Sequence, residues 1–268
     1  MYNFQEYSPD SRLTPWIRKY WTATEFMNGK VAPQVFPGDS YSDLVFAIDK
    51  AKGIVTTYIH GMVTKATEID RSSESMMMFG IGFKPAAITT FTRISASEFT
   101  NREVELTLLQ TLFNRSYYET LPELQSIETM IAYTDYYLTK LLPRLHVPDK
   151  QMTHAVHLLQ LSKGQMSIAD LAAEVCLGSR QLERKFNVNI GVTPKVLARE
   201  LRFNYAQKYL IGNPHKSLLE IAETCGYYDY THFTDEFKAL SGDTPAFFRE
   251  RKSAFYTHRA NSIKRICH

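Results

Sequence analysis

The sequence predicts an α+β protein of two domains, an antiparallel β-domain followed by an all-α domain. Short apolar runs, separated by Gly, Pro, Asp and Ser, occupy the first ninety residues, as they do in antiparallel sheets. From Ser97 onward, apolar residues recur at three and four positions, which is the helical period. A pattern of helix, tight turn and second helix then occurs twice. With 268 residues, each domain is long enough to enclose its own core.

The composition is that of a globular protein, with 44% hydrophobic and 22% charged residues. No apolar run approaches the roughly 18 residues of a membrane span. The first twelve residues lack the basic and apolar regions of a signal peptide. We therefore expect a cytoplasmic protein with no membrane partner. The three cysteines, Cys176, Cys225 and Cys267, include no close pair, which argues against a disulfide framework or a cysteine-rich zinc site.

Three segments of the N-terminal part predict strands: Asp43–Asp49, Ile54–Ile59 and Met76–Phe83. Each is rich in β-branched or bulky apolar residues and is bounded by residues that favour turns. In the third segment alternate residues share a face, with Met77, Phe79, Ile81 and Phe83 on one side and Met76, Met78, Gly80 and Gly82 on the other. The glycines allow the close approach of a ligand or of another strand. Together the segments predict an antiparallel barrel or sandwich.

The segment after Ser97 predicts a helical extension of the β-domain. Its apolar residues at helical spacing are Val104, Leu108, Leu109, Leu112, Leu124, Ile127, Met130, Ile131, Leu138, Leu141 and Leu142. Pro122 and Pro143 mark helix boundaries. The stretch Pro143–Asp149 has two prolines in seven residues and is the best linker candidate. We therefore expect one domain over residues 1–145 and a second over residues 146–268.

The most specific stretch of the chain runs from Ala222 to Arg249. A short helix with an apolar face precedes a glycine that can adopt the left-handed conformation and end it. A capped second helix with its own apolar face follows. The residues concerned are Ile221, Ala222 and Cys225, then Gly226, then Asp229, Phe233 and Phe237. This is the helix-turn-helix pattern, whose second helix lies in the major groove of DNA.

A second copy of the pattern lies about fifty residues upstream. Ser167, Ile168, Leu171, Ala172, Leu182, Phe186, Gly191, Thr193 and Pro194 align with Ser217, Leu218, Ile221, Ala222, Phe233, Phe237, Gly242, Thr244 and Pro245. The offset rises from fifty to fifty-one residues between the two helices, so the second turn is one residue longer. Two copies of one supersecondary unit are far less common by accident than one. Cys176 takes the place of Gly226, which predicts a differently shaped first turn.

This spacing, with its Gly-x-Thr-Pro ending and Arg249, resembles the signature of the AraC/XylS family of bacterial transcription regulators over about Lys150 to Arg251. The resemblance implies two helix-turn-helix units and double-stranded DNA as partner, with RNA polymerase as a further partner if the protein is an activator. Members commonly carry a cupin-like barrel ahead of these units. The pieces Pro37–Asp39, Asp43–Phe46 and Gly80–Pro85 look like the sensor domain of one subgroup. In the family the helical extension often forms a homodimer contact; its alternative role is to pack on the barrel.

The outward faces of the two second helices predict the DNA-binding residues. They are Ser179, Arg180, Glu183, Arg184 and Asn187 in the first unit and Tyr230, Thr231, His232, Thr234 and Asp235 in the second. Ser179 is expected to cap the first of these helices, and Arg184 is the best candidate for bidentate contact with guanine. Asp235 stands where the family more often has a basic or amide residue, so the second unit is expected to serve mainly for positioning. The alternative for each residue is a solvated helix face.

The charge distribution agrees with a DNA-binding second half. Residues 1–149 contain 14 Lys and Arg against 17 Asp and Glu, a net charge of −3. Residues 150–268 contain 17 against 11, a net charge of +6. An acidic half joined to a basic half fits a sensor joined to a polyanion binder.

The N-terminal domain offers two further readings, a small-molecule sensor or a module for dimerisation and protein contact. Seven aromatic residues form a candidate ligand pocket: Trp16, Tyr20, Trp21, Phe36, Tyr41, Tyr58 and Phe79. Aromatic residues in a small barrel are more usually core.

An enzyme built on the barrel is the less favoured class. Metal-dependent cupins need two or three histidines, but His60 is the only histidine before His146. His154 and His157 have a spacing that suits a metal, without a further ligand. No nucleophile motif or phosphate-binding glycine loop is present in the sequence. We therefore expect no catalytic residue, metal or cofactor.

Overall fold

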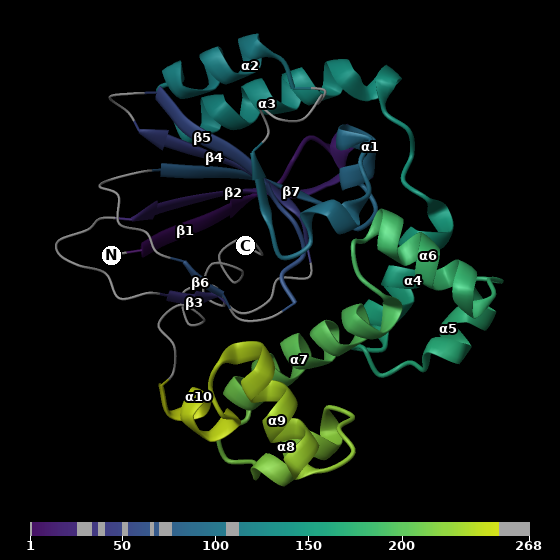
Figure 1. Cartoon of the computed structure of the whole chain (residues 1–268). Helices are drawn as coiled ribbons and strands as arrows, with labels where there is room; N and C mark the ends of the chain where they lie inside the picture. Colours follow the sequence, from purple (N-terminus) through teal and green to yellow (C-terminus); the bar gives the residue numbers. More distant parts are fainter. Residues whose placement is uncertain are drawn as a thin grey trace.

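The computed structural model describes residues 2–25, 34–36, 41–49, 53–64, 67–69, 77–105 and 113–251. Figure 1 shows a β-rich N-terminal half and a helical C-terminal half, as the α+β prediction requires. Several predicted features lie outside the described residues: Pro37–Asp39, Met76, Leu108, Leu109, Leu112 and Cys267. No helix in the described part of the chain is long and apolar enough to cross a membrane.

An antiparallel six-stranded sheet forms the body of the N-terminal half, with the strand order β1-β2-β7-β4-β5-β8. Its strands are β1 (Tyr2–Tyr7), β2 (Ile17–Glu25), β4 (Asp43–Asp49), β5 (Gly53–His60), β7 (Met77–Phe83) and β8 (Glu103–Glu105). A separate antiparallel pair is formed by β3 (Gln34–Phe36) and β6 (Thr67–Ile69). The three predicted strands are thus confirmed as β4, β5 and β7.

Strand β7 lies between β2 and β4, and every second residue of β7 points into the hydrophobic core. Phe79, Ile81 and Phe83 are almost fully buried in the cluster beneath the sheet. On the other face a Cβ added to Gly80 would lie 1.9 Å from the indole of Trp21. The absence of a side chain at Gly80 therefore admits a tryptophan from the neighbouring strand.

Helices cover one side of this sheet (Figure 1). They are α1 (Ile88–Thr92), α2 (Arg115–Thr120) and α3 (Ile127–Leu141), with a 3-10 turn η2 (Ala96–Phe99) after α1. Helix α2 is fixed to α3 by Tyr117, which is fully buried and whose hydroxyl lies 2.8 Å from that of Thr134. The prediction that Val104 is helical is wrong, because it pairs with Ile59 as part of β8 at the edge of the sheet.

The predicted linker is held against the N-terminal half. Leu145 belongs to the N-terminal core, and the indole Nε1 of Trp16 donates to the carbonyl of His146 at 2.8 Å. Asp149 then caps α4 by accepting from the backbone of Gln151 at 2.9 Å. These contacts hold the segment that leads into α4 in place.

The C-terminal half is entirely helical, and two hydrophobic clusters divide it. Its helices are α4 (Lys150–Leu161), α5 (Ile168–Glu174), α6 (Ser179–Asn189), α7 (Pro194–Gly212), α8 (Leu218–Thr224), α9 (Tyr230–Ser241) and α10 (Pro245–Arg251). The first cluster joins α4, α5 and α6 to the start of α7, and the second joins the rest of α7 to α8, α9 and α10. Figure 1 shows α7 as the single helix that connects the two bodies.

Candidate nucleic-acid interface

The second unit consists of α8, a turn and α9, as its sequence predicted. Ser217 caps α8 in a capping box, in which the Ser217 backbone N–H donates to the carboxylate of Glu220 at 2.8 Å. Gly226 has φ +76°, the left-handed conformation that ends the helix. Asp229 then accepts from the backbone of His232 at 2.7 Å and caps α9. Local capping therefore sets where the candidate reading helix begins.

The first turn begins with the same left-handed backbone as the second but is one residue shorter, since it runs from Val175 to Gly178 against Cys225 to Asp229. Cys176 adopts φ +53°, in the same region as Gly226. Its N–H donates to Ala173 at 3.0 Å, as that of Gly226 donates to Glu223 at 3.1 Å. A non-glycine residue in this conformation is strained, so the tertiary packing imposes the turn on an unfavourable side chain.

Replacing Cys176 with glycine should therefore raise the free energy of unfolding by about 0.5 to 1 kcal/mol, because glycine adopts the left-handed region without a Cβ penalty. Denaturant unfolding of the full chain measures the change. Cys176→Ala is the matched control, since it removes the sulfur and keeps the Cβ. An equal gain in both variants would assign the effect to the thiol.

The candidate reading helix of the first unit is α6. Its N-cap is Gly178, so the prediction that Ser179 is the cap is wrong; Ser179 is the first helical residue and is exposed. Leu182 and Phe186 are fully buried, as predicted. The predicted outward residues are all exposed, namely Arg180, Glu183, Arg184 and Asn187.

Lys185, the one lysine of α6, anchors the helix instead of facing outward. The ammonium of Lys185 lies 2.8 Å from Asp149 Oδ2 and 2.7 Å from Gln151 Oε1, at the start of α4. Burial opposes the charge of Asp149, but hydrogen bonds from Lys185 and from two backbone N–H groups lower its pKa below the ordinary value. Among the described residues, neither Arg180 nor Arg184 forms an ion pair. Both guanidinium groups are on exposed residues.

The candidate reading helix of the second unit is α9. Phe233 and Phe237 are fully buried, and Phe237 packs edge-on against Phe203 of α7 with ring centroids 5.1 Å apart. Four of the five predicted outward residues are exposed: Tyr230, Thr231, His232 and Asp235. Thr234 is half-buried and its hydroxyl is shielded from solvent, so its prediction as an outward residue is corrected.

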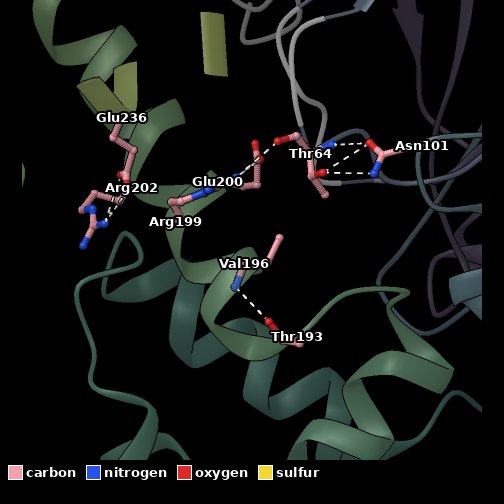
Figure 2. Close-up of polar contacts among 8 residues, drawn as sticks. All are labelled: Thr64, Asn101, Thr193, Val196, Arg199, Glu200, Arg202 and Glu236. Atoms are coloured by element: carbon pink, nitrogen blue, oxygen red, sulfur yellow. Dashed lines mark hydrogen bonds and ion pairs between the residues drawn. The ribbon is translucent and has the colours of Figure 1, made fainter. Parts of the chain in front are cut away.

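An ion pair fixes α9 to the connecting helix. Arg202 of α7 donates to both carboxylate oxygens of Glu236, at 3.0 and 3.2 Å (Figure 2). The same carboxylate lies 3.7 Å from Nε2 of His232, one turn earlier on α9. This pair was not predicted, because its two residues lie 34 positions apart in the sequence.

The N-terminal half contacts the first unit without covering its outward face. Met62 and Ala86 are members of the first unit's hydrophobic cluster. Thr100 donates to the carbonyl of Gly191 at 2.7 Å, and Arg199 of α7 donates to the carbonyl of Thr64 at 3.3 Å. Figure 2 shows this second contact, with Thr64 held in turn by Asn101. The contacts lie at the C-terminal end of α6 and on α7.

The seven aromatic candidates for a ligand pocket lie in different surroundings. Trp16, Tyr20 and Phe79 belong to the packed core, and the hydroxyl of Tyr20 donates to Asp135 at 2.8 Å. Three others are half-buried: Trp21 covers Gly80, Tyr41 stacks on an arginine, and Tyr58 lies on β5. Phe36 lies in β3, and its side chain is outside the described part of the structure. Three of the seven residues are thus core, the alternative named above.

The histidine candidates lie apart on the surface. His154 and His157 are both exposed on α4, and His60 is half-buried at the end of β5. In the described segments, no group of three or more His, Cys, Asp or Glu side chains could hold a metal ion.

Two family models match the chain. A helix-turn-helix domain matches residues 171–251, and a domain of unknown function (DUF6597) matches residues 5–105. The first match covers α6 to α10 and most of α5. The second covers the sheet from β1 to β8.

The curated relatives that the chain matches are transcription regulators. It is 31% identical over 118 residues to the HTH-type transcriptional regulator ArgR of Pseudomonas aeruginosa, which covers 42% of this chain and 36% of that protein. It is 30% identical over 107 residues to the HTH-type transcriptional activator RhaR of Yersinia pseudotuberculosis, 39% of this chain and 37% of that one. The match thus spans about a third of the length of these relatives.

Among solved structures, one similar chain is a transcriptional regulator with an AraC-type DNA-binding domain from Chromobacterium violaceum. It is 30% identical, with a TM-score of 0.36, and the match covers 39% of this chain and 93% of that one.

Proposed function

We propose that this chain, whose C-terminal half carries a helix-turn-helix domain of the AraC type, is a sequence-specific DNA-binding transcription regulator. Double-stranded DNA is its partner. RNA polymerase is a second partner if the protein activates transcription.

The observation that carries the proposal is a pair of helices, α6 and α9, that expose polar outward faces from one connecting helix. Helix α9 is capped by Asp229, and both helices pack against α7 through buried phenylalanines. Helix α7 has 19 residues and is about 28 Å long. That is shorter than the roughly 34 Å between successive major-groove faces of B-DNA. Simultaneous contact by both helices therefore favours bent DNA.

The two reading helices have different chemical roles in this proposal. In α6, the free guanidinium groups of Arg180 and Arg184 contact guanine or phosphate, with Ser179, Glu183 and Asn187 beside them. In α9 the carboxylate of Asp235 is repelled by phosphate, and the exposed side chains of Tyr230, Thr231 and His232 provide the other contacts. The first unit therefore supplies most of the base preference, and the second unit positions the protein along the DNA.

For the N-terminal half, residues 1–145, we propose control of the DNA-binding half, residues 146–268, by a small molecule or by homodimerisation. A ligand acts by shifting the population that is competent to bind DNA. The alternative is a ligand-independent regulator in which this half is a contact module. Trp16, Tyr20 and Phe79 are packed in the N-terminal core, which favours the ligand-independent alternative for this part of the molecule.

Selection from a random-sequence DNA pool tests the proposal. The full-length protein is incubated with the pool at near-physiological salt, and the retained DNA is sequenced. An enriched motif in two parts, about one helical turn apart, is the expected result. Enrichment only with residues 146–268 would mean that the N-terminal half silences the domain. No enrichment with either protein would contradict sequence-specific binding.

Replacing Arg184 with alanine should weaken binding to the selected motif by about 1 to 3 kcal/mol and relax the base preference at one position, because a bidentate contact with guanine is lost. Competition binding with single-base variants of the motif measures both effects. Arg115→Ala is the control, since Arg115 is exposed on α2 and pairs with Glu119. Uniform weakening across all sequences would instead assign Arg184 to phosphate contact.

A further inference from the structure

We propose that the guanidinium of Arg18 binds a small carboxylate, and that this carboxylate is the effector of the regulator. The regulatory role rests on the function proposed above, whereas carboxylate binding can be tested without DNA. Arg18 stacks on Tyr41, which contacts Gln160 of α4, the first helix of the DNA-binding half.

Arg18 occupies a β-bulge. Ile17 of β2 pairs with Phe83 of β7, and Lys19 pairs with the adjacent Gly82, so Arg18 is the additional residue between two consecutive partners. A bulge takes one residue out of the alternation of its strand and redirects its side chain. Ile17 enters the core, and the side chain of Lys19 pairs with Glu6 of β1. Arg18 is thereby directed to a different partner from its neighbours.

The surroundings of the Arg18 guanidinium leave it short of an acceptor. Its Cζ lies 3.6 Å from the centre of the Tyr41 ring, so the two groups are stacked. Its Nε and Nη2 atoms are shielded from solvent, and no hydrogen-bond acceptor in the described part of the chain reaches them. A guanidinium is charged at any physiological pH, and shielding a charge without a partner is costly. An anionic ligand would remove this cost.

The geometry of the two donors points to a carboxylate. Nε–H and Nη2–H form one edge of the guanidinium, which matches the two oxygens of a carboxylate. Arg12 of this chain uses the same edge on Asp10, with both donor–acceptor distances at 2.9 Å. One guanidinium balances one negative charge, and the next cation in the sequence, Lys19, already pairs with Glu6. A monocarboxylate therefore suits the site better than a phosphate dianion.

Tyr41 connects this position to the DNA-binding half. Its hydroxyl accepts from the side-chain amide of Gln160, on α4, at 3.2 Å. Because the donor edge of Arg18 is shielded from solvent, a carboxylate reaches it only in a second arrangement of the side chains around Arg18 and Tyr41. Occupation therefore selects that arrangement, and with it a different contact between Tyr41 and α4. A ligand that binds one arrangement more tightly shifts the population toward it.

The test is a fluorescence titration of the full-length protein, because its two tryptophans, Trp16 and Trp21, lie within three residues of Arg18. The probes are sodium acetate, butyrate, octanoate and benzoate. Butyramide, benzamide, sodium phosphate and sodium chloride at matched ionic strength are the controls. We expect saturable binding of at least one carboxylate and none of its amide. Failure of every carboxylate, or saturable binding of phosphate in preference, would overturn the proposal.

Variants assign the binding to Arg18. Arg18→Gln should weaken carboxylate affinity at least about tenfold, since a bidentate charge-assisted contact is lost. Arg18→Lys keeps the charge without the planar edge and should give a smaller loss. Arg12→Gln is the matched control, with unchanged affinity. Thermal unfolding verifies that each variant is folded, and equal affinity in folded Arg18→Gln would overturn the assignment.

A further variant tests whether carboxylate binding changes DNA affinity through Tyr41. Tyr41→Phe keeps the stacked ring and removes the hydroxyl that Gln160 contacts, so carboxylate binding should persist while its effect on DNA affinity falls. If carboxylate binds through Arg18 but the DNA pool yields no motif, the proposed function fails and the site stands. If a motif is found and carboxylate leaves DNA affinity unchanged, the effector role is wrong.

Discussion

Replacing Phe237 with alanine should unfold the second helix-turn-helix unit and leave the first one folded. Phe237 is fully buried and contacts Phe203, Phe233 and Phe248, which come from α7, α9 and α10. Loss of a buried phenylalanine costs about 3 to 5 kcal/mol. That is a large part of what a unit of this size can supply. The two clusters of the helical half have no member in common, so the loss should stay in one unit.

Hydrogen exchange of the full chain measures this result residue by residue. Amides of α8 and α9 should lose protection, while those of α4 and α5 keep theirs. Phe186→Ala is the matched variant, since Phe186 is the aligned and equally buried residue of α6. Phe186→Ala should instead remove protection from the amides of the first unit. Loss of protection across both units in either variant would show that α7 couples them into one cooperative body.

Strand alternation and the recurrence of apolar residues at three and four positions predicted the elements whose cores and caps are local. Strand β4 has the bounds that were predicted, Asp43–Asp49, and Asp229 caps α9 as expected. Buried faces and caps depend on neighbours within one element, so periodicity predicts them well. Val104 was mistaken for a helical residue because its strand has only three residues, too few to show alternation. The edge of β5, distant in sequence, determines its conformation.

The candidate interface was predicted in part for the same reason. Exposure of Arg180 and Arg184 follows from the period of one helix, which places Leu182 and Phe186 inward. The contact between Arg202 and Glu236 joins residues 34 positions apart and has no local signal. Arg18 is a comparable case, because a bulge depends on the register of two strands. Contacts between residues that are distant in the sequence therefore become visible only in the folded structure.

A substitution of Gly191 with alanine should destabilise the junction between the N-terminal half and the first unit by about 2 to 4 kcal/mol. Gly191 has φ +95°, a conformation that costs a side-chain-bearing residue about 1 to 3 kcal/mol. An added Cβ would lie 2.6 Å from the hydroxyl of Thr100 and 2.8 Å from the carbonyl oxygen of Ala96. The backbone of η2 would have to move away from the end of α6.

Denaturant unfolding and hydrogen exchange of η2 measure this loss, with Gly212→Ala as the control because a Cβ there meets no atom within 4 Å. Gly212 lies at the end of α7, where alanine should be neutral or slightly stabilising. Thr100→Ala alone removes a hydrogen bond of 2.7 Å and should cost about 0.5 to 1.5 kcal/mol. The double variant should cost less than the sum of the two, because losing the hydroxyl relieves part of the clash. Strict additivity would mean that the contact with Thr100 adds nothing, so that backbone strain and the contact with Ala96 account for the cost of Gly191→Ala.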